Sequence, residues 1–400
     1  MTALTTGSEA WWQSKNGPEW ERLKASYRVT FWWRDPAGTQ KTSTVKRVWL
    51  YITGVTDHHQ NARPQSLERI PDTDVWQWQG EFSPEWRGSY CFIPSDNEND
   101  FAGAVFEGEQ PDRMALREGW RKLLPHAISD PLNPQSWRGG RGHAVSALEM
   151  PDAPVQPGWN QPDTPYKKPV CIEWNSARLN NRRRAWIFTT GDESPERPLA
   201  VLLDGQFWAE SMPVWPALAS LTRDGKLPPA VYVLIDAIDT EHRSRELPCN
   251  PDFWLAVQEE LLPLVKKNAS FSDRADHTVV AGQSFGGLSS LYAGLNWPQR
   301  FGCILSQSGS YWWPHRGAQR DGLLIEQLKA GEKTARGLRI VLEAGRNEPL
   351  IFRANQAIYA ELQHTQQPVI WRQVDGGHDA LCWRGGLTQG LMTLWQPLIH

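Results

Sequence analysis

Cysteine is scarce, the net charge is near zero, and no long apolar run occurs in this 400-residue sequence. The five cysteines lie far apart without a CxxC pair, so we expect buried, reduced thiols rather than a disulfide framework or a thiolate metal site. The 42 Lys and Arg residues against 45 Asp and Glu residues give −3, which excludes a general nucleic-acid binder and a polybasic membrane anchor. No stretch approaches the roughly 18 apolar residues of a membrane span, so we expect no membrane insertion.

The first residues also lack the basic, apolar and small-residue regions of a secretory signal, and the sequence therefore predicts a cytoplasmic protein. Hydrophobic residues make up 40% and charged residues 22% of the chain, as in soluble globular proteins. The length favours more than one domain. The sequence leaves the oligomeric state open.

A proline-rich stretch divides the chain. Six prolines fall between residues 151 and 170, where they remove backbone donors and disfavour helix, so this stretch is typical of a stiff linker. We therefore predict an N-terminal domain over residues 1–150, a linker over 151–170 and a second domain over 171–400.

Short alternating segments before the linker predict strands, at residues 27–33, 45–53, 75–80 and 88–94. Their spacing, with Pro, Gly and Asp turns between them, favours an antiparallel β-sandwich of the immunoglobulin-like kind. A helix is expected before them, over residues 14–24.

After the linker, buried strands alternate with helices. This pattern predicts an α/β fold with a mostly parallel sheet covered on both faces. Such sheets carry their chemistry in the loops at the carboxyl ends of the strands. The expected strands cover residues 184–190, 199–203, 230–235, 278–281, 303–306, 338–342 and 369–374.

One of these strands runs into Gly282-Gln283-Ser284-Phe285-Gly286-Gly287, a GxSxG pattern followed by a helical segment. Strand, GxSxG and helix in this order predict the nucleophile elbow of the α/β-hydrolases, with Ser284 as the nucleophile. The flanking glycines are expected because side chains there would collide with the neighbouring strand and helix.

A serine nucleophile needs a base, which in this fold lies in the loop after the last strand. His378, in the Gly-Gly-His loop after residues 369–374, meets this description. We expect His364 to be solvated and His315 to matter for binding rather than proton transfer.

The acid is less well defined by the sequence. Glu348 follows the strand at 338–342 on a loop that could reach the histidine, and we favour it. Glu343, Asp375 and a dyad without a strong acid stay open. For the oxyanion, the expected donors are the backbone N–H of Phe285 and that of Gly205 in the loop at residues 204–208.

Specific strings of residues occur in both halves of the chain. They are Asp57-His58-His59-Gln60, Asp130-Pro131-Leu132-Asn133-Pro134, Leu203-Asp204-Gly205-Gln206-Phe207-Trp208, Gly282–Gly287, Gly309-Ser310-Tyr311-Trp312-Trp313-Pro314 and Asp375-Gly376-Gly377-His378-Asp379. Through these strings the whole chain resembles the enterochelin (enterobactin) esterases, bacterial cytoplasmic enzymes of the esterase-D-like branch of the α/β-hydrolases. The resemblance places that family's nucleophile on Ser284 and its histidine on His378.

The resemblance implies a serine esterase that cleaves the trilactone of ferric enterobactin, a catecholate siderophore, to 2,3-dihydroxybenzoylserine units so that iron is released. It implies no cofactor, because the iron enters with the substrate, and we expect no metal site at Asp57-His58-His59. The alternatives are a generic carboxylesterase or acyltransferase and a non-catalytic siderophore-binding protein.

A bulky, aromatic, anionic ligand calls for aromatic faces and guanidinium groups. The sequence has 23 Trp, and 12 of them precede residue 161. Those on predicted strands, such as Trp32, Trp49, Trp76 and Trp78, we interpret as core. The candidate ligand contacts are those on loops of the second domain: Trp208, Trp312, Trp313, His315, Arg316, Arg346 and Arg353.

Overall fold

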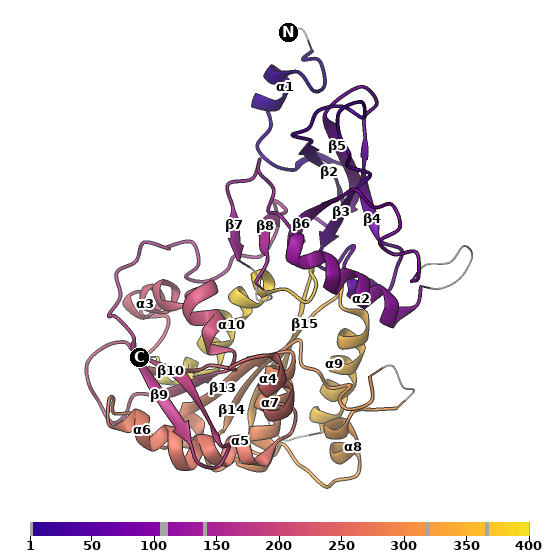
Figure 1. The fold of residues 1–400 in the computed structure, drawn as a ribbon. Helices are drawn as coiled ribbons and strands as arrows, with labels where there is room; N and C mark the ends of the chain where they lie inside the picture. The colour runs from indigo at the N-terminus through magenta and orange to yellow at the C-terminus, as the bar shows by residue number, and fades with distance from the viewer. Residues whose placement is uncertain (1–2, 105–110, 139–141, 317–319, 365–367, 400) are drawn as a thin grey trace. The chain divides into compact units, whose positions relative to one another are not determined.

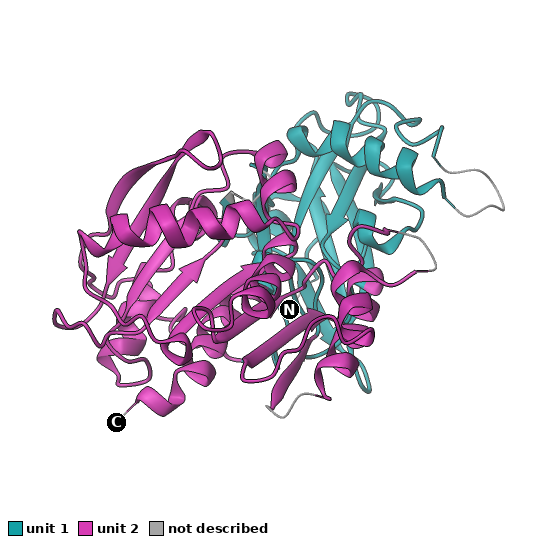
Figure 2. Cartoon of the chain, turned by 90° about the horizontal axis from the view of Figure 1, so that it is seen from below, with its two compact units in different colours: residues 1–154, 346–348, 375–382 teal, residues 155–345, 349–374, 383–400 magenta. Residues whose placement is uncertain are grey.

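A computed structural model describes residues 3–104, 111–138, 142–316, 320–364 and 368–399, which divide into two compact units (Figure 2). The first unit is Met1–Pro154 with two short segments from far along the chain, Arg346–Glu348 and Asp375–Cys382. The second unit is Val155–Gly345, Pro349–Val374 and Trp383–His400. The two short segments differ from the expectation that all of residues 171–400 pack as one domain.

The first unit is built on an antiparallel sheet, as the sequence predicts (Figure 1). Its strand order among the described residues is β1-β2-β5-β4-β3-β6-β8-β7. Strand β4 pairs with β3 through residues 65–67 and with β5 through residues 68–69, so it joins the two halves of the sheet. The strands are β1 (Glu19–Arg22), β2 (Tyr27–Arg34), β3 (Arg47–Ile52), β4 (Gln65–Arg69), β5 (Val75–Phe82), β6 (Arg87–Ser95), β7 (Ser136–Arg138) and β8 (Ala144–Glu149).

Strand β3 is buried on both faces because each face meets a different core. Val48 and Leu50 point into a cluster shared with β2, β5 and β6, which joins the two halves of the sheet. Trp49 and Tyr51 point the other way, against Trp120 of helix α2 (Arg113–Leu123). Alternation of side chains along a strand accounts for this division, and aromatic rings fill much of both clusters.

The expected helix over residues 14–24 is wrong. The structure has a short helix α1 (Glu9–Gln13) and then strand β1, which pairs with β2 in antiparallel register. All four β1 residues are exposed, so the segment has no hydrophobic pattern, and pairing with β2 decides its conformation.

The second unit has a mixed sheet in the order β16-β15-β14-β13-β11-β12-β10-β9. Strands β9 and β10 are antiparallel, and the other six run parallel. The strands are β9 (Val170–Ser176), β10 (Asn181–Thr189), β11 (Leu199–Leu202), β12 (Val231–Ile235), β13 (Thr278–Gln283), β14 (Cys303–Gln307), β15 (Arg339–Gly345) and β16 (Val369–Val374). With its helices this is the predicted α/β-hydrolase architecture (Figure 1).

The helices of the second half cover this sheet, with α7 packed on β13 and β14 and α9 packed on β15 and β16. None of the helices in the described ranges is long and apolar enough to cross a bilayer. The helices are α3 (Trp215–Arg223), α4 (Thr240–Glu246), α5 (Pro251–Ala256), α6 (Leu262–Lys266), α7 (Phe285–Asn296), α8 (Leu323–Lys329), α9 (Pro349–Leu362) and α10 (Ala380–Leu394).

The proline-rich stretch packs against the second unit from residue 155 on. The Trp159 indole N–H donates to the carbonyl of Arg384 (2.8 Å), and the Thr388 hydroxyl donates to the carbonyl of Pro157 (2.8 Å). These bonds attach the stretch to helix α10, so this part of the expected linker is held in place.

Tryptophan burial in the first unit gives a stability prediction. Trp120 is 1% exposed and meets Phe101 and Tyr51, whereas Trp20 on β1 is 44% exposed. Trp120→Ala should lower the free energy of unfolding by about 3–5 kcal/mol, because the truncation leaves a cavity. Trp20→Ala, the matched control, should change it by less than about 0.5 kcal/mol. Urea unfolding followed by far-UV circular dichroism measures both, and equal losses would contradict the assignment of Trp120 to the core.

Candidate active site

Ser284 stands at a sharp turn between β13 and α7. Its backbone has φ 60° and ψ −120°, a conformation that is strained for a residue with a side chain. A strained serine between a strand and a helix is the geometry of a nucleophile elbow. The structure thus gives Ser284 the backbone that the GxSxG pattern predicts.

The glycines of the pattern differ in how much space a side chain would find there. A Cβ on Gly282 would lie 2.4 Å from the backbone of Gly286, and one on Gly287 would lie 2.8 Å from the Ser306 hydroxyl oxygen. A Cβ on Gly286 would meet only ordinary contacts, the nearest at 3.5 Å from Leu203. The expected collision therefore holds at Gly282 and is wrong for Gly286.

The turn is held by the segment that follows β14. The Ser284 N–H donates to the Gln307 carbonyl (3.0 Å), and the Ser310 N–H donates to the Ser284 carbonyl (3.1 Å). The two hydroxyl oxygens of Ser284 and Ser310 lie 3.3 Å apart. Ser310 was not singled out from the sequence as a contact of Ser284, because only the β13–β14 pairing brings it there.

The two expected oxyanion donors lie on segments that flank this turn. Phe285 is the first residue of α7, so its N–H has no intrahelical acceptor and points out of a helix N-terminus, where negative charge is favoured. Gly205 follows β11, and a Cβ there would lie 2.5 Å from the backbone nitrogen of Ile235. Only glycine allows this loop to approach the end of β12 so closely.

Arg243 connects these two segments. Its guanidinium donates to both carboxylate oxygens of Asp204 (2.8 and 2.9 Å) and to the carbonyl of Gln283 (3.3 Å). It also lies 5.6 Å from the centre of the Phe285 ring. One side chain therefore joins the residue before Gly205 to the residue before Ser284. No local pattern predicts this role of Arg243, because three separate segments make the contact.

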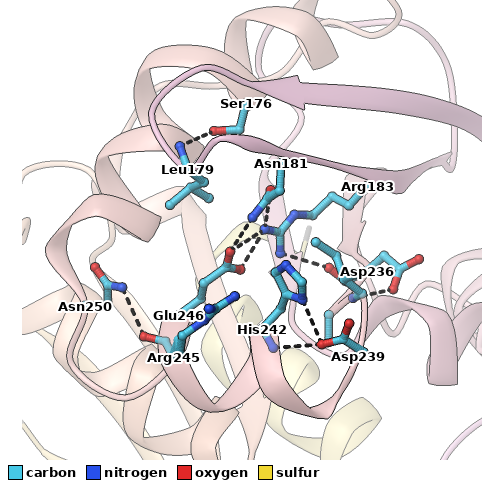
Figure 3. A network of polar contacts seen from close by, with 12 residues as sticks. Ser176, Leu179, Asn181, Arg183, Asp236, Asp239, His242, Arg245, Glu246 and Asn250 are labelled. Atoms are coloured by element: carbon cyan, nitrogen blue, oxygen red, sulfur yellow. Dashed lines mark hydrogen bonds and ion pairs between the residues drawn. The ribbon is translucent and has the colours of Figure 1, made fainter.

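Helix α4, which carries Arg243, is fixed by a buried ion pair (Figure 3). Glu246 binds Arg183 of β10 (2.6 and 2.8 Å), and the Asp239 carboxylate caps the helix by accepting from the His242 N–H (2.8 Å). A small pocket of about 10 Å³, the space of a single water molecule, lies beside Asp204 and these groups. It is smaller than usual ligand pockets, so the network acts as support for Arg243.

The expected acid and base meet in the first unit. Glu348 Oε1 and His378 Nδ1 lie 2.5 Å apart, with the Glu348 side chain 0% and the His378 side chain 13% exposed. A fully buried carboxylate hydrogen bonded to one ring nitrogen fixes the orientation of the imidazole and stabilises its protonated form.

The other two candidate acids have different partners. Glu343 is buried, accepts from the Gln307 side-chain amide (3.0 Å) and pairs with Arg372 (3.3 Å). Asp375 accepts from the Ser83 hydroxyl (2.7 Å) and pairs with Arg346 (2.5 Å). This geometry favours Glu348.

A further carboxyl, Asp57, lies in the same unit and is 2% exposed. Burial, with smaller contributions from the charges of Glu348 and Asp379, raises the pKa of Asp57 from 3.8 to about 7. The hydrogen bond from the Gln60 side chain (3.0 Å) acts in the opposite direction. The carboxyl thus stays largely protonated in the folded protein at mildly acid pH.

An aromatic and cationic stack extends from the elbow. The Trp312 ring lies 5.9 Å from the Phe285 ring, and the exposed guanidinium of Arg316 lies 4.1 Å above Trp312. Both belong to the loop after β14. Among the expected ligand contacts, Trp312 and Arg316 therefore lie beside the elbow, with the exposed Arg316 cation over the face of the Trp312 ring.

The remaining expected contacts are more dispersed. Trp208 is 1% exposed and its indole donates to Gln283 (3.1 Å), so the expectation of an open aromatic face there is wrong. Trp313 packs partly against the core, and His315 is half-buried. Arg346 is paired with Asp375, and Arg353 is exposed on α9.

The site residues thus fall into two groups. The elbow, the oxyanion segments and the Trp312–Arg316 stack belong to the second unit, and the Glu348–His378 pair belongs to the first. Within the described ranges, no three His, Cys, Asp or Glu side chains are arranged to hold a metal ion, and this includes Asp57-His58-His59.

Comparison with known proteins gives two family matches. Residues 28–159 match the family described as "Enterochelin esterase, N-terminal", and residues 176–394 match the family described as "Putative esterase". The chain is 69% identical to the iron(III) enterobactin esterase of Escherichia coli strain K12, over 100% of this chain and 99% of that protein.

Two solved structures are similar over nearly the whole chain. The ferric enterobactin esterase of Salmonella typhimurium is 70% identical, with a TM-score of 0.95, and the match covers 98% of this chain and 100% of that one. The enterobactin esterase of Shigella flexneri, solved in the presence of enterobactin, is 68% identical, with a TM-score of 0.88 and coverage of 99% and 100%.

The raised pKa of Asp57 predicts a pH-dependent stability. The folded state holds the proton more tightly than the unfolded state, so the contribution is complete below about pH 4 and is lost as the pH rises through about 7. Relative to Asp57→Asn, the wild type should lose roughly 4 kcal/mol of unfolding free energy over this range. Urea midpoints of both proteins from pH 4 to 8 test this, and a constant difference between them would contradict it.

Proposed function

The chain belongs to the enterochelin (enterobactin) esterase family, and we propose on that basis that it hydrolyses the ester bonds of ferric enterobactin with Ser284 as nucleophile. It is a carboxylic ester hydrolase. The observation that carries the proposed mechanism is the hydrogen bond between Glu348 and His378 (2.5 Å). Their segments directly follow β15 and β16, which run parallel to β13, the strand that ends directly before Ser284.

The acid–base chemistry follows from the ring nitrogen that Glu348 engages. Because Nδ1 of His378 is bonded to the carboxylate, Nε2 takes the proton of the Ser284 hydroxyl as its oxygen attacks the ester carbonyl. His378 then gives this proton to the departing serine hydroxyl of the lactone. Water, activated by the same nitrogen, cleaves the acyl-enzyme and restores Ser284.

The oxyanion of each tetrahedral intermediate is stabilised by the N–H groups of Phe285 and Gly205. The placement of Phe285 at the N-terminus of α7 adds the favourable end of a helix dipole. Arg243 supports both donors, because it binds Asp204, directly before Gly205, and Gln283, two residues before Phe285.

Substrate recognition follows from the chemistry of an anionic, aromatic complex. Trp312 and Arg316 offer a ring face and a guanidinium next to the elbow, which suit a catecholate. Hydrolysis of the trilactone turns one hexadentate ligand into smaller ones. The chelate effect then falls, and iron is more easily released.

We further propose that the enzyme needs no cofactor of its own, since the iron arrives with the substrate. It would act in the cytoplasm on the imported complex. The five cysteines, all within the described residues, form no disulfide, which supports a reducing compartment. The small-molecule siderophore is the proposed partner, and no nucleic acid is expected.

Ser284→Ala tests the mechanism. With ferric enterobactin, the wild type should release trimer, dimer and monomer fragments of dihydroxybenzoylserine, separable by chromatography. Without its nucleophile the variant should lose at least about a thousandfold in rate. Ser220→Ala is the control and should keep its rate, because the Ser220 hydroxyl, on helix α3, donates to Gln161 (3.0 Å) and has no part in the proposed mechanism. Equal rates for Ser284→Ala and wild type would refute the mechanism, and rapid turnover of short p-nitrophenyl esters with intact enterobactin would refute the substrate.

Arg243→Ala tests the support of the oxyanion donors. Loss of a bidentate, charge-assisted contact should lower kcat about 10- to 100-fold, with a smaller change in KM. Added guanidinium should restore part of the rate, because it can occupy the same contacts with Asp204. Arg178→Ala removes exposed ion pairs with Asp252 and Glu259 and is the control. An unchanged kcat for Arg243→Ala would show that the contact is dispensable.

A further inference from the structure

The segments that carry the acid and the base are packed on the N-terminal β unit. Arg346–Glu348 and Asp375–Cys382 belong to that unit by their contacts, although the rest of β15, β16 and their helices belong to the other. The two segments also bond to each other, through the Asn347 N–H and the Gly376 carbonyl (3.0 Å). The position of the Glu348–His378 pair therefore depends on residues of the first 154 positions.

The base segment is held by strand β6 and the turn before it. Ser89 donates to the Asp379 carboxylate through its N–H and its hydroxyl (both 2.6 Å). The Arg87 N–H donates to the Asp375 carbonyl (3.2 Å). These bonds fix both sides of His378. The acid segment is bonded to this base segment, and it also contacts another group of the first unit.

That group is Gln60, from the Asp57-His58-His59-Gln60 sequence that the proposed chemistry does not use. Its side-chain nitrogen donates one hydrogen to the Asn347 carbonyl (2.8 Å), directly before Glu348, and the other to Asp57 Oδ1 (3.0 Å). Both hydrogens of the amide are thus used. The buried Asp57 orients the amide so that its nitrogen faces the acid segment.

Two further contacts join residues near Gln60 to the base segment. The His59 ring lies 4.9 Å from the His378 ring, and Gly54, with φ +87°, lies against Gly377. A Cβ on Gly54 would be 2.8 Å from the Gly377 nitrogen. The turn at residues 54–60 therefore contacts both the acid segment and the base segment.

We propose that Gln60 is a positioning residue for catalysis, which holds the Glu348–His378 pair in its hydrogen-bonded geometry through the Asn347 carbonyl, with Asp57 orienting the Gln60 amide. The proposal rests on the proposed function, in which His378 is the base. In this proposal the N-terminal unit contributes to catalysis, because it holds Glu348 and His378 in the alignment on which the rate depends.

Gln60→Met tests this, because methionine keeps the length of the side chain and removes both donors. With ferric enterobactin as substrate and the full-length enzyme, kcat should fall about tenfold while KM stays within about twofold. Tyr90→Phe, which removes another buried hydrogen bond of the same unit, to Asp130 (2.7 Å), is the matched control and should keep its kcat. Thermal unfolding of both variants confirms that each is folded at the assay temperature.

A double-mutant cycle separates positioning from general damage. If Gln60 acts through Glu348, adding Gln60→Met to the Glu348→Gln variant should lower kcat by less than about twofold. A full tenfold loss in that background, a wild-type kcat for Gln60→Met, or an equal loss in Tyr90→Phe would each overturn the proposal. Failure of the proposed function would look different, since it would appear as retained hydrolysis by Ser284→Ala.

Discussion

The fully buried carboxylate of Glu348 is the constraint on which the site depends. A charge without solvent contact is tolerated only when it is hydrogen bonded, and its partner here is His378. That requirement fixes two loops at once, because both groups lie on short segments after parallel strands. The loops are held by the antiparallel unit through Ser89 and Gln60, while the hydrolase sheet holds Ser284. Ser284 lies in the second unit, and the Glu348–His378 pair lies in the first.

Much of the fold was predictable because burial leaves a pattern in the sequence. The parallel strands β11 to β15 are almost wholly buried and have apolar stretches, and β2 and β5 contain alternating segments. Strands β1, β4, β7, β8 and β9 were missed. The residues of β1, β4 and β9 are mostly polar or exposed, so pairing with neighbours decides their conformation. Strand β7 has only three residues, and β8 is largely buried but shows no alternation. The association of Asp375–Cys382 with the first unit was also beyond the sequence, since it depends on contacts between residues nearly 300 positions apart.

Site residues were predictable where their own neighbours in the sequence mark them, and not where contacts between distant segments bring them together. Ser284 is marked by its own neighbours, and His378 by the Gly-Gly loop after the last strand. The sequence favours Glu348 but leaves Glu343 and Asp375 open, because all three lie at or just after the ends of strands of the same sheet. Side-chain geometry supports Glu348, since only this carboxylate is bonded to His378 among the three in their printed contacts. Arg243 and Gln60 leave no local signal, since each contacts segments distant in the chain. Trp208 shows the reverse error: its place in a loop suggested an open face, but the ring is buried.

The contact between Gly54 and Gly377 has a consequence for how such a chain can change over evolution. A methyl group on Gly54 would approach the Gly377 backbone to 2.8 Å, and one on Gly377 would approach Gly54 to 2.5 Å, so neither position tolerates a side chain unless the other loop moves. Both glycines belong to the first unit, yet they lie far apart in the sequence, so a side chain gained at one position has to be matched by a change in the other loop. Each loop therefore limits which substitutions the other can accept.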